Sequence, residues 1–217
     1  MVKVSIAILA GGQSRRLGED KALLRLTGSG PTLLERTAGV CAGLTDDLFV
    51  IAPDERDYER FGLRVVGDRF PGEGPAGGVI TALHAARYAH CLVLGCDYPL
   101  LSRPLLRWLI EQAEPDRPVL PRLPAAGRQG GGHTIEVLHG VYPVTALAEI
   151  EQAFVTGERQ LARIVRNLQP RLIGPEALER FDPGLTSFRS VNRRVDTEWA
   201  RTVLAERVAR AGVRRRS

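Results

Sequence analysis

The sequence predicts an α/β fold in which a mainly parallel β-sheet lies between two layers of helices, a three-layer αβα arrangement. Short apolar runs alternate along the chain with segments of about ten residues or more that have helical character. The runs at residues 2–9 and 90–95 are mostly apolar on both faces, as strands inside a parallel sheet are. The chain has 217 residues, of which 44% are hydrophobic and 25% charged, and such a chain can bury a core of its own.

The first half of the chain contains four predicted strands and three predicted helices. Residues 2–9 are a β-branched, mostly apolar run that stops at the pair Gly11-Gly12, and residues 31–43 place apolar side chains on one side of a helix. The other predicted strands are residues 48–52, 63–66 and 90–95. The other predicted helices are residues 54–60 and a segment that follows the glycine-rich loop 72–78 and runs through residue 89.

The second half alternates in the same way. Helical character extends over residues 101–114, 146–155 and 158–168, and residues 196–210 form an amphipathic closing helix. Predicted strands are residues 118–123 and 188–191, and residues 134–138 follow a glycine-rich connection around residues 130–132. We find no linker long enough to separate two domains, so we expect residues 1–217 to form a single domain.

The formal net charge of +5 is concentrated at the end of the chain. Residues 201–217 carry six arginines and one glutamate, so the first 200 residues hold 24 basic and 24 acidic side chains. A basic tail on a neutral body is typical of a solvated helix end, and we expect no nucleic-acid partner. Apolar runs stay below the roughly 18–20 residues of a membrane span, and residues 4–10 are too few for a signal peptide. We therefore expect a cytoplasmic protein without a membrane partner.

The three cysteines, Cys41, Cys91 and Cys96, form no disulfide framework or zinc pattern. Cys91 and Cys96 lie five positions apart along a predicted strand, so they face opposite sides of the sheet and cannot pair. We expect all three thiols to be reduced and buried. The four histidines share no ligand spacing, and Trp108 and Trp199 fall in amphipathic helices, where packing is the simpler role.

The loop after the first strand gathers glycines and cations. Gly11 and Gly12 permit backbone conformations in which several amides face one concavity, and Arg15, Arg16 and Lys21 add three cations within seven residues. Ligands of open α/β sheets bind beyond the carboxyl ends of strands, where this loop must lie. The Walker pattern GxxxxGK[ST] and the dinucleotide pattern GxGxxG are both absent from it. The loop therefore predicts a polyphosphate site that neither pattern describes.

Residues 9–24, LAGGQSRRLGEDKALL, resemble the LAGGxSxRMGxDK signature of the molybdopterin-guanine dinucleotide guanylyltransferase (MobA) family, with Leu17 where methionine is usual. Related signatures occur in other nucleotidyltransferases of the same fold. Further similarities follow in the family's order at Gly67-Asp68, Pro71-Gly72, residues 74–78, residues 94–99 (LGCDYP), residues 137–142 (VLHGVY), residues 157–159 (GER) and residues 188–192 (FRSVN).

The chain departs from the family pattern at several of these positions. Val137 replaces a usual proline and Pro143 a usual basic residue, and Ala76 stands where leucine is common. Ser190 occupies the position of the first asparagine of FxNxN. Ile51 lies where some members place a nucleotide-contacting asparagine. These departures concern the second substrate and the base more than the phosphates.

The resemblance implies a Rossmann-like sheet of the nucleotide-diphospho-sugar transferase type. It also implies transfer of GMP from MgGTP to the terminal phosphate of molybdenum-molybdopterin, with release of pyrophosphate. Residues 1–100 would then form the nucleotide-binding half and residues 101–217 the acceptor-substrate half. Proteins that hand over the cofactor or mature molybdoenzymes would be transient partners.

The resemblance also assigns site residues by matched position. Lys21 and Arg15 would neutralise charge on the departing pyrophosphate, and Asp97 would hold Mg²⁺, which prefers one or two carboxylates together with substrate phosphates. The nucleotide-binding residues would be Leu9, Ala10, Gly11, Gly12, Lys21, Asp68 and Asp97. The acceptor-substrate residues would be Gly77, Gly78 and Asn192.

Other interpretations stay open at this point. Cytidylyl transfer to molybdopterin or nucleotidyl transfer to a sugar phosphate would use the same glycine and lysine loop, and a non-catalytic nucleotide-binding module would also contain it. Asp68 and Asp97 are also typical turn residues, and Asn192 is a suitable cap for the last helix. The glycines at residues 130–132 would contact the pterin or form a plain loop.

Overall fold

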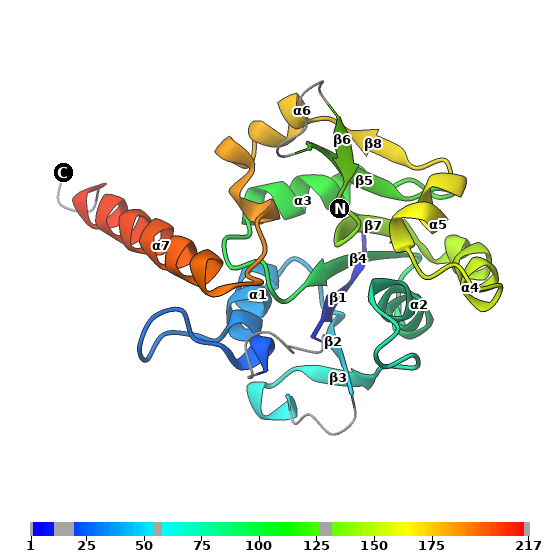
Figure 1. Ribbon diagram of the computed structural model, residues 1–217, viewed down its shortest axis with the longest axis horizontal. Coiled ribbons are helices and arrows are strands. Elements are labelled where there is room, and N and C mark those ends of the chain that lie inside the picture. Colours follow the sequence, from blue (N-terminus) through cyan, green and yellow to red (C-terminus); the bar gives the residue numbers. More distant parts are fainter. Residues whose placement is uncertain (1, 11–19, 54–57, 126–131, 215–217) are drawn as a thin grey trace.

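The computed structural model describes residues 2–10, 20–53, 58–125 and 132–214. Eight strands form one sheet in the order β3-β2-β1-β4-β7-β5-β6, with β8 paired to β5 (Figure 1). The strands are β1 Ser5–Leu9, β2 Leu48–Ala52, β3 Arg64–Gly67, β4 His90–Gly95, β5 Val119–Pro124, β6 His133–Ile135, β7 His139–Pro143 and β8 Arg171–Ile173. The helices are α1 Leu33–Cys41, α2 Pro75–Ala85, α3 Arg103–Glu111, α4 Leu147–Val155, α5 Leu161–Asn167, α6 Pro175–Glu179 and α7 Arg194–Arg214.

The sheet is parallel where the site forms. Strands β3, β2, β1 and β4 run in the same direction, so their carboxyl ends meet at one edge. Leu9 at the end of β1 is paired with Ile51 of β2 and Gly95 of β4. Strand β7 runs antiparallel to both β4 and β5, and β6 runs antiparallel to β5. The predicted mainly parallel sheet is thus confirmed, with antiparallel pairs added on one side.

Helices cover both faces of this sheet, which confirms the predicted three layers (Figure 1). Ala7 of β1 packs on the face that α2, α4 and α5 cover, whereas its neighbours Ile6 and Ile8 pack on the face of α1 and α3. Cys91 and Cys96 fall into clusters on opposite faces. All three cysteines are buried and none of them forms a disulfide, as the sequence predicts.

The helix predicted after the loop 72–78 both begins and ends earlier in the chain than expected. It begins at Pro75, so Gly77 and Gly78 belong to the helix, and it ends at Ala85 rather than near residue 89. The backbone amide of Arg87 donates instead to the side chains of Ser5 (2.9 Å) and Asp47 (3.0 Å). Because the Arg87 amide bonds to the buried side chains of Ser5 and Asp47, it makes no helical hydrogen bond and the helix ends before it. Of the predicted helix 54–60, residues 54–57 lie outside the described residues, and a short 3₁₀ helix occupies Glu59–Phe61.

The predicted last strand at residues 188–191 is wrong. A 3₁₀ segment covers Pro183–Phe188, and the residues that follow join no strand of the described chain. The backbone amide of Val191 donates to the carbonyl oxygen of Asp97 (2.8 Å), outside the strand ladders. The composition of residues 188–191 favours an extended backbone, but the sheet offers no neighbour there. Strands β7 and β8 and helix α6 were not predicted; β8 has three residues and α6 has five, too few for a clear pattern.

The buried contacts of the last helix lie near its start. Ala200 is buried in a small cluster with Leu26, Leu33 and Val191. Farther along, Val208 is 72% exposed, and Figure 1 shows α7 extending away from the sheet. The helix starts two residues before the predicted 196 and continues four past 210.

Candidate nucleotide site

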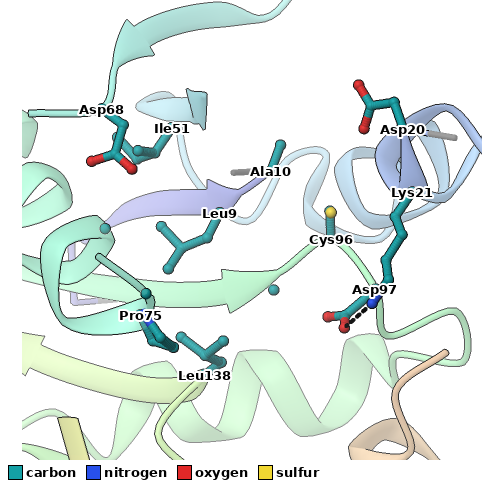
Figure 2. Close-up of a pocket in the computed structure, with 13 residues that line it drawn as sticks. Leu9, Ala10, Asp20, Lys21, Ile51, Asp68, Pro75, Cys96, Asp97 and Leu138 are labelled. Carbon is teal, nitrogen blue, oxygen red and sulfur yellow. Dashed lines mark ion pairs between the residues drawn. The ribbon is translucent and has the colours of Figure 1, made fainter. Parts of the chain in front are cut away.

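A pocket of about 230 Å³ opens at the edge where the parallel strands end. Its walls come from the ends of β1, β2 and β4, from Asp68 after β3, and from the first turn of α2 (Figure 2). This is the position in which open α/β sheets bind ligands. The lining residues are Leu9, Ala10, Asp20, Lys21, Ile51, Asp68, Gly74, Pro75, Gly78, Gly95, Cys96, Asp97 and Leu138.

The pocket brings together most of the described residues that the resemblance assigns to the site. Leu9, Ala10, Lys21, Asp68 and Asp97, expected to bind the nucleotide, all line it, and so does Gly78. Asn192 reaches the site through Lys21. Gly11, Gly12 and Arg15 lie outside the described residues.

Lys21 extends into the pocket from a well-anchored turn. Asp20 caps the 3₁₀ helix Lys21–Leu23, since its Oδ1 accepts from the amide of Ala22 at 3.0 Å. Its other oxygen, Oδ2, accepts from the hydroxyl of Tyr58 at 2.6 Å. Lys21 Nζ lies 2.6 Å from Oδ1 of Asn192 and 3.9 Å from Oδ2 of Asp97. Figure 2 shows the Lys21 side chain extending toward Asp97, with the ion pair drawn as a dashed line.

Asp97 follows directly after the buried end of β4. Its side chain is 24% exposed, and burial raises the pKa of its carboxyl group, while the Lys21 ammonium opposes that rise. A neighbouring cation therefore favours the charged form of this carboxylate. Gly95 leaves the space that the carboxylate occupies, because a Cβ built on Gly95 would lie 2.8 Å from Oδ1 of Asp97.

Asp68 lines the opposite side of the pocket. Its Oδ1 accepts from the amide of Phe70 (3.0 Å) and from the hydroxyl of Thr81 (3.2 Å). These contacts tie the loop after β3 to α2 and fix the carboxylate at the rim. The hypothesis of a turn role and that of a nucleotide contact are thus compatible.

The start of α2 gives the pocket a favourable place for negative charge. Gly74 precedes the helix with φ of 78° and no side-chain cap, and Pro75 occupies the first turn. The amides of a first helical turn carry partial positive charge and attract anions. This feature adds to the cationic side that Lys21 provides.

Gly77 and Gly78 have a packing role in the structure. A Cβ on Gly77 would lie 2.7 Å from Cβ of Phe70, and one on Gly78 would lie 2.9 Å from Cδ1 of Leu9. Both glycines therefore let α2 approach its neighbours closely. Gly78 also lines the pocket, whereas Gly77 is not among the described residues that do so.

Sequence reasoning missed a second acidic group near Asp97. Glu136 accepts from the hydroxyl of Tyr98 (3.2 Å) and from the amide of Leu138 (2.9 Å). Burial raises the pKa of Glu136, and the charge of Asp97 raises it further. The pairing of β4 with β7 brings the Glu136 segment here, and no motif marked this glutamate. Gly95 and the apolar wall residue Leu138 lie within segments that resemble the family, but neither was assigned to the site.

The oxygen ligand that the pocket offers, the Asp97 carboxylate, suits a hard cation. Such a cation would receive most of its other ligands from the substrate and from water. Within the described ranges, no group of three or more histidine, cysteine, aspartate or glutamate side chains could hold a metal ion. Mg²⁺ is commonly bound by one or two carboxylates plus substrate phosphates, and Asp97 offers one such carboxylate.

None of the helices in the described part of the chain is long and apolar enough to cross a membrane.

Comparisons with known proteins point in one direction. Residues 6–172 match the model of the MobA-like NTP transferase domain. The chain is 35% identical over 187 residues to a probable molybdenum cofactor guanylyltransferase of Chloroflexus aggregans, covering 85% of this chain and 87% of that protein. It is 36% identical over 191 residues to the molybdenum cofactor guanylyltransferase of Pseudomonas syringae pv. syringae, covering 86% of this chain and 89% of the relative.

Solved structures share the fold. The molybdopterin-guanine dinucleotide biosynthesis protein A of Archaeoglobus fulgidus superposes with a TM-score of 0.76 at 23% identity, over 93% of this chain and 99% of that one. The 2-C-methyl-D-erythritol 4-phosphate cytidylyltransferase of Thermus thermophilus superposes with a TM-score of 0.70 at 19% identity, over 94% of this chain and 100% of that one. At these identities the likeness concerns the fold alone.

Proposed function

The chain belongs to the MobA-like NTP transferase family, and from this membership we propose that it transfers GMP from GTP to the terminal phosphate of molybdopterin. The resemblance seen in the sequence is thereby confirmed at the level of the family. One observation carries the proposal within the molecule. Lys21 and Asp97, a cation and a carboxylate, face each other 3.9 Å apart at the pocket where the parallel strands end.

We assign the nucleotide to this pocket. The backbone of Leu9 and Ala10, with Gly11 and Gly12, would contact the base, the ribose and the phosphates. Asp68, held at the rim by Thr81, would accept hydrogen bonds from the base or the ribose. The triphosphate would then extend from the first turn of α2 toward Lys21.

Asp97 would hold Mg²⁺ against the phosphates. Bound Mg²⁺ supplies positive charge that neutralises the phosphate oxygens. Lys21 lies close enough to share this task, and Arg15 would join it on the departing pyrophosphate. Asp97 would hold the metal from a backbone that is itself fixed, because its carbonyl oxygen accepts from the amide of Val191.

The proposed reaction is a single displacement at phosphorus. An oxygen of the acceptor's terminal phosphate forms a bond to the α-phosphorus, and the bond from the α-phosphorus to the bridging oxygen of the β-phosphate breaks. That oxygen leaves with pyrophosphate. The attacking phosphate is already ionised near neutral pH, so no general base is required. Catalysis then depends on positioning and on charge stabilisation by Lys21, Arg15 and the metal.

The proposal also covers the half of the chain that would bind the acceptor, the location of the protein in the cell and its partners. Residues 1–100 would bind the nucleotide and residues 101–217 the acceptor, within a single domain over residues 1–217. Gly77, Gly78 and Asn192 would lie on the acceptor side. We place the reaction in the cytoplasm, with transient contacts to proteins that hand over the cofactor or mature molybdoenzymes, and without a nucleic-acid or membrane partner.

The test measures pyrophosphate release by the purified chain with Mg²⁺, molybdopterin and each of the four nucleoside triphosphates in turn. We expect release with GTP that depends on molybdopterin. A preference for CTP would overturn the guanine assignment and favour cytidylyl transfer. Binding of GTP without any turnover, with Asp97→Ala changing only the affinity for the nucleotide, would favour a non-catalytic module.

A further inference from the structure

Three polar side chains form a connected series that ends on Lys21. Lys21 Nζ donates to Oδ1 of Asn192 at 2.6 Å, and Nδ2 of Asn192 donates to Oγ of Ser190 at 2.7 Å. An ammonium group has only donors, so it must meet the oxygen of the Asn192 amide. The amide nitrogen then requires an acceptor on its other side, and the Ser190 hydroxyl provides it. Together the two contacts select one orientation of the amide.

The backbone that carries Asn192 is held on both sides. The preceding residue, Val191, is fully buried and donates from its amide to the carbonyl oxygen of Asp97 at 2.8 Å. The amide of Asn192 donates to Oδ2 of Asp196 at 3.1 Å, in the first turn of α7. With the backbone fixed, rotation of the Asn192 side chain is the freedom that remains. Ser190 is the residue placed to restrict it.

We propose that Ser190 is a positioning residue that holds the Asn192 amide oxygen toward Lys21 and so keeps the lysine ammonium beside Asp97. The inference rests on the proposed function, in which Lys21 serves the phosphates of the nucleotide. It also gives the departure at position 190 a physical role. The short serine side chain reaches the amide of its neighbour two residues on and leaves the amide oxygen to Lys21.

Binding of inorganic pyrophosphate tests this role without requiring turnover. We expect Ser190→Ala to weaken the affinity for magnesium pyrophosphate, measured by calorimetry, about fivefold, as the loss of one neutral hydrogen bond would. Ser190→Thr keeps the hydroxyl and should bind as the parent does. Ser29→Ala is the matched control, since Ser29 is exposed and outside the pocket lining. Thermal unfolding of each variant should match the parent.

A double-variant cycle separates positioning from a general effect on the fold. If Ser190 acts through Asn192, then adding Ser190→Ala to Asn192→Ala should cause no further loss of pyrophosphate affinity. Unchanged affinity in Ser190→Ala, or an equal loss in both backgrounds, would overturn the inference. Absence of turnover with every nucleoside triphosphate would instead overturn the proposed function, while the pyrophosphate result would still decide the role of Ser190.

Discussion

Lys21 and Asn192 stand 171 positions apart in the sequence, yet Nζ of Lys21 lies 2.6 Å from Oδ1 of Asn192. The contact joins the turn after the first strand to the segment that precedes α7. Asp97, at the end of β4, completes the group at 3.9 Å from the same ammonium. Three distant parts of the chain therefore supply one polar cluster, two members of which, Lys21 and Asp97, line the pocket.

Removal of the Lys21 charge should abolish most activity and leave the fold intact. Loss of a single group that stabilises transition-state charge costs on the order of a hundredfold or more in turnover. The side chain of Lys21 is 22% exposed and lies at the pocket rather than in the core, so Lys21→Ala should unfold at the parent's temperature. Pyrophosphate release and thermal unfolding measure the two quantities.

Lys3 is the matched control for this variant, because it is the only other lysine of the sequence and is exposed. Lys3→Ala should retain full turnover. Unfolding of Lys21→Ala under conditions in which the parent is native would show that Lys21 is a structural residue.

Asp97→Asn should remove the charge that would bind the metal while keeping the size of the side chain. The amide fills the same space as the carboxylate but carries no charge, so the dependence of turnover on Mg²⁺ should shift to much higher concentration or disappear. We expect a loss of at least about a hundredfold at low millimolar Mg²⁺. The exposed Asp116 provides the control variant Asp116→Asn, which should titrate with Mg²⁺ as the parent does. Equal Mg²⁺ dependence in the parent and Asp97→Asn would exclude Asp97 as the metal ligand.

Gly95→Ala should displace the Asp97 carboxylate. The added Cβ would lie 2.8 Å from both Oδ1 of Asp97 and Cε2 of Tyr98, closer than such atoms approach. We expect a loss of about 1–3 kcal/mol in the free energy of unfolding and at least about a tenfold loss of turnover per folded molecule. Gly39→Ala on the exposed side of α1 meets nothing within 4 Å and should stabilise the fold by about 0.5–1 kcal/mol. Activity of Gly95→Ala equal to that of Gly39→Ala would contradict the assigned role of the glycine.

His139 makes stability depend on pH in the acid range. Burial lowers its pKa from the ordinary 6.5 to about 3, so the folded protein keeps the imidazole neutral where the unfolded chain binds a proton. The contribution of this neutral imidazole is complete above pH 6.5 and is lost as the pH falls toward 3. A one-proton difference changes the free energy of unfolding by about 1.4 kcal/mol per pH unit in that window.

Denaturant titrations at a series of pH values measure this slope. His139→Phe, which keeps an aromatic ring between Tyr98 and Phe188, should lose that part of the slope. His133→Phe changes an exposed histidine and should retain it. An unchanged slope in His139→Phe would mean that other groups cause the acid sensitivity.

The sequence predicts best those parts of the fold that local pattern determines. Strands β1 and β4 are apolar on both faces, and β2 and β4 have the predicted bounds. The prediction for residues 188–191 failed because a strand needs a neighbour, and a short segment does not reveal whether it has one. Strand β8, with three residues, carries too few positions for a pattern.

The same division holds for the candidate site. The motif around Lys21 and the strand-ending Asp97 could be recognised because each lies within a short run of sequence. Glu136, by contrast, comes near Asp97 only through the register of β4 with β7. The link from Ser190 through Asn192 to Lys21 depends on how the start of α7 docks, and no local pattern contains that information.

The burial of the cysteines offers a direct way to follow ligand occupancy. Cys41 and Cys91 are fully buried, and burial raises the pKa of Cys41 to about 12 and that of Cys91 as well. Cys96, 6% exposed, is the one thiol of the three whose residue lines the pocket. Alkylation under native conditions would thus report on a single sulfhydryl, and a nucleotide seated over it would shield that sulfhydryl from the reagent.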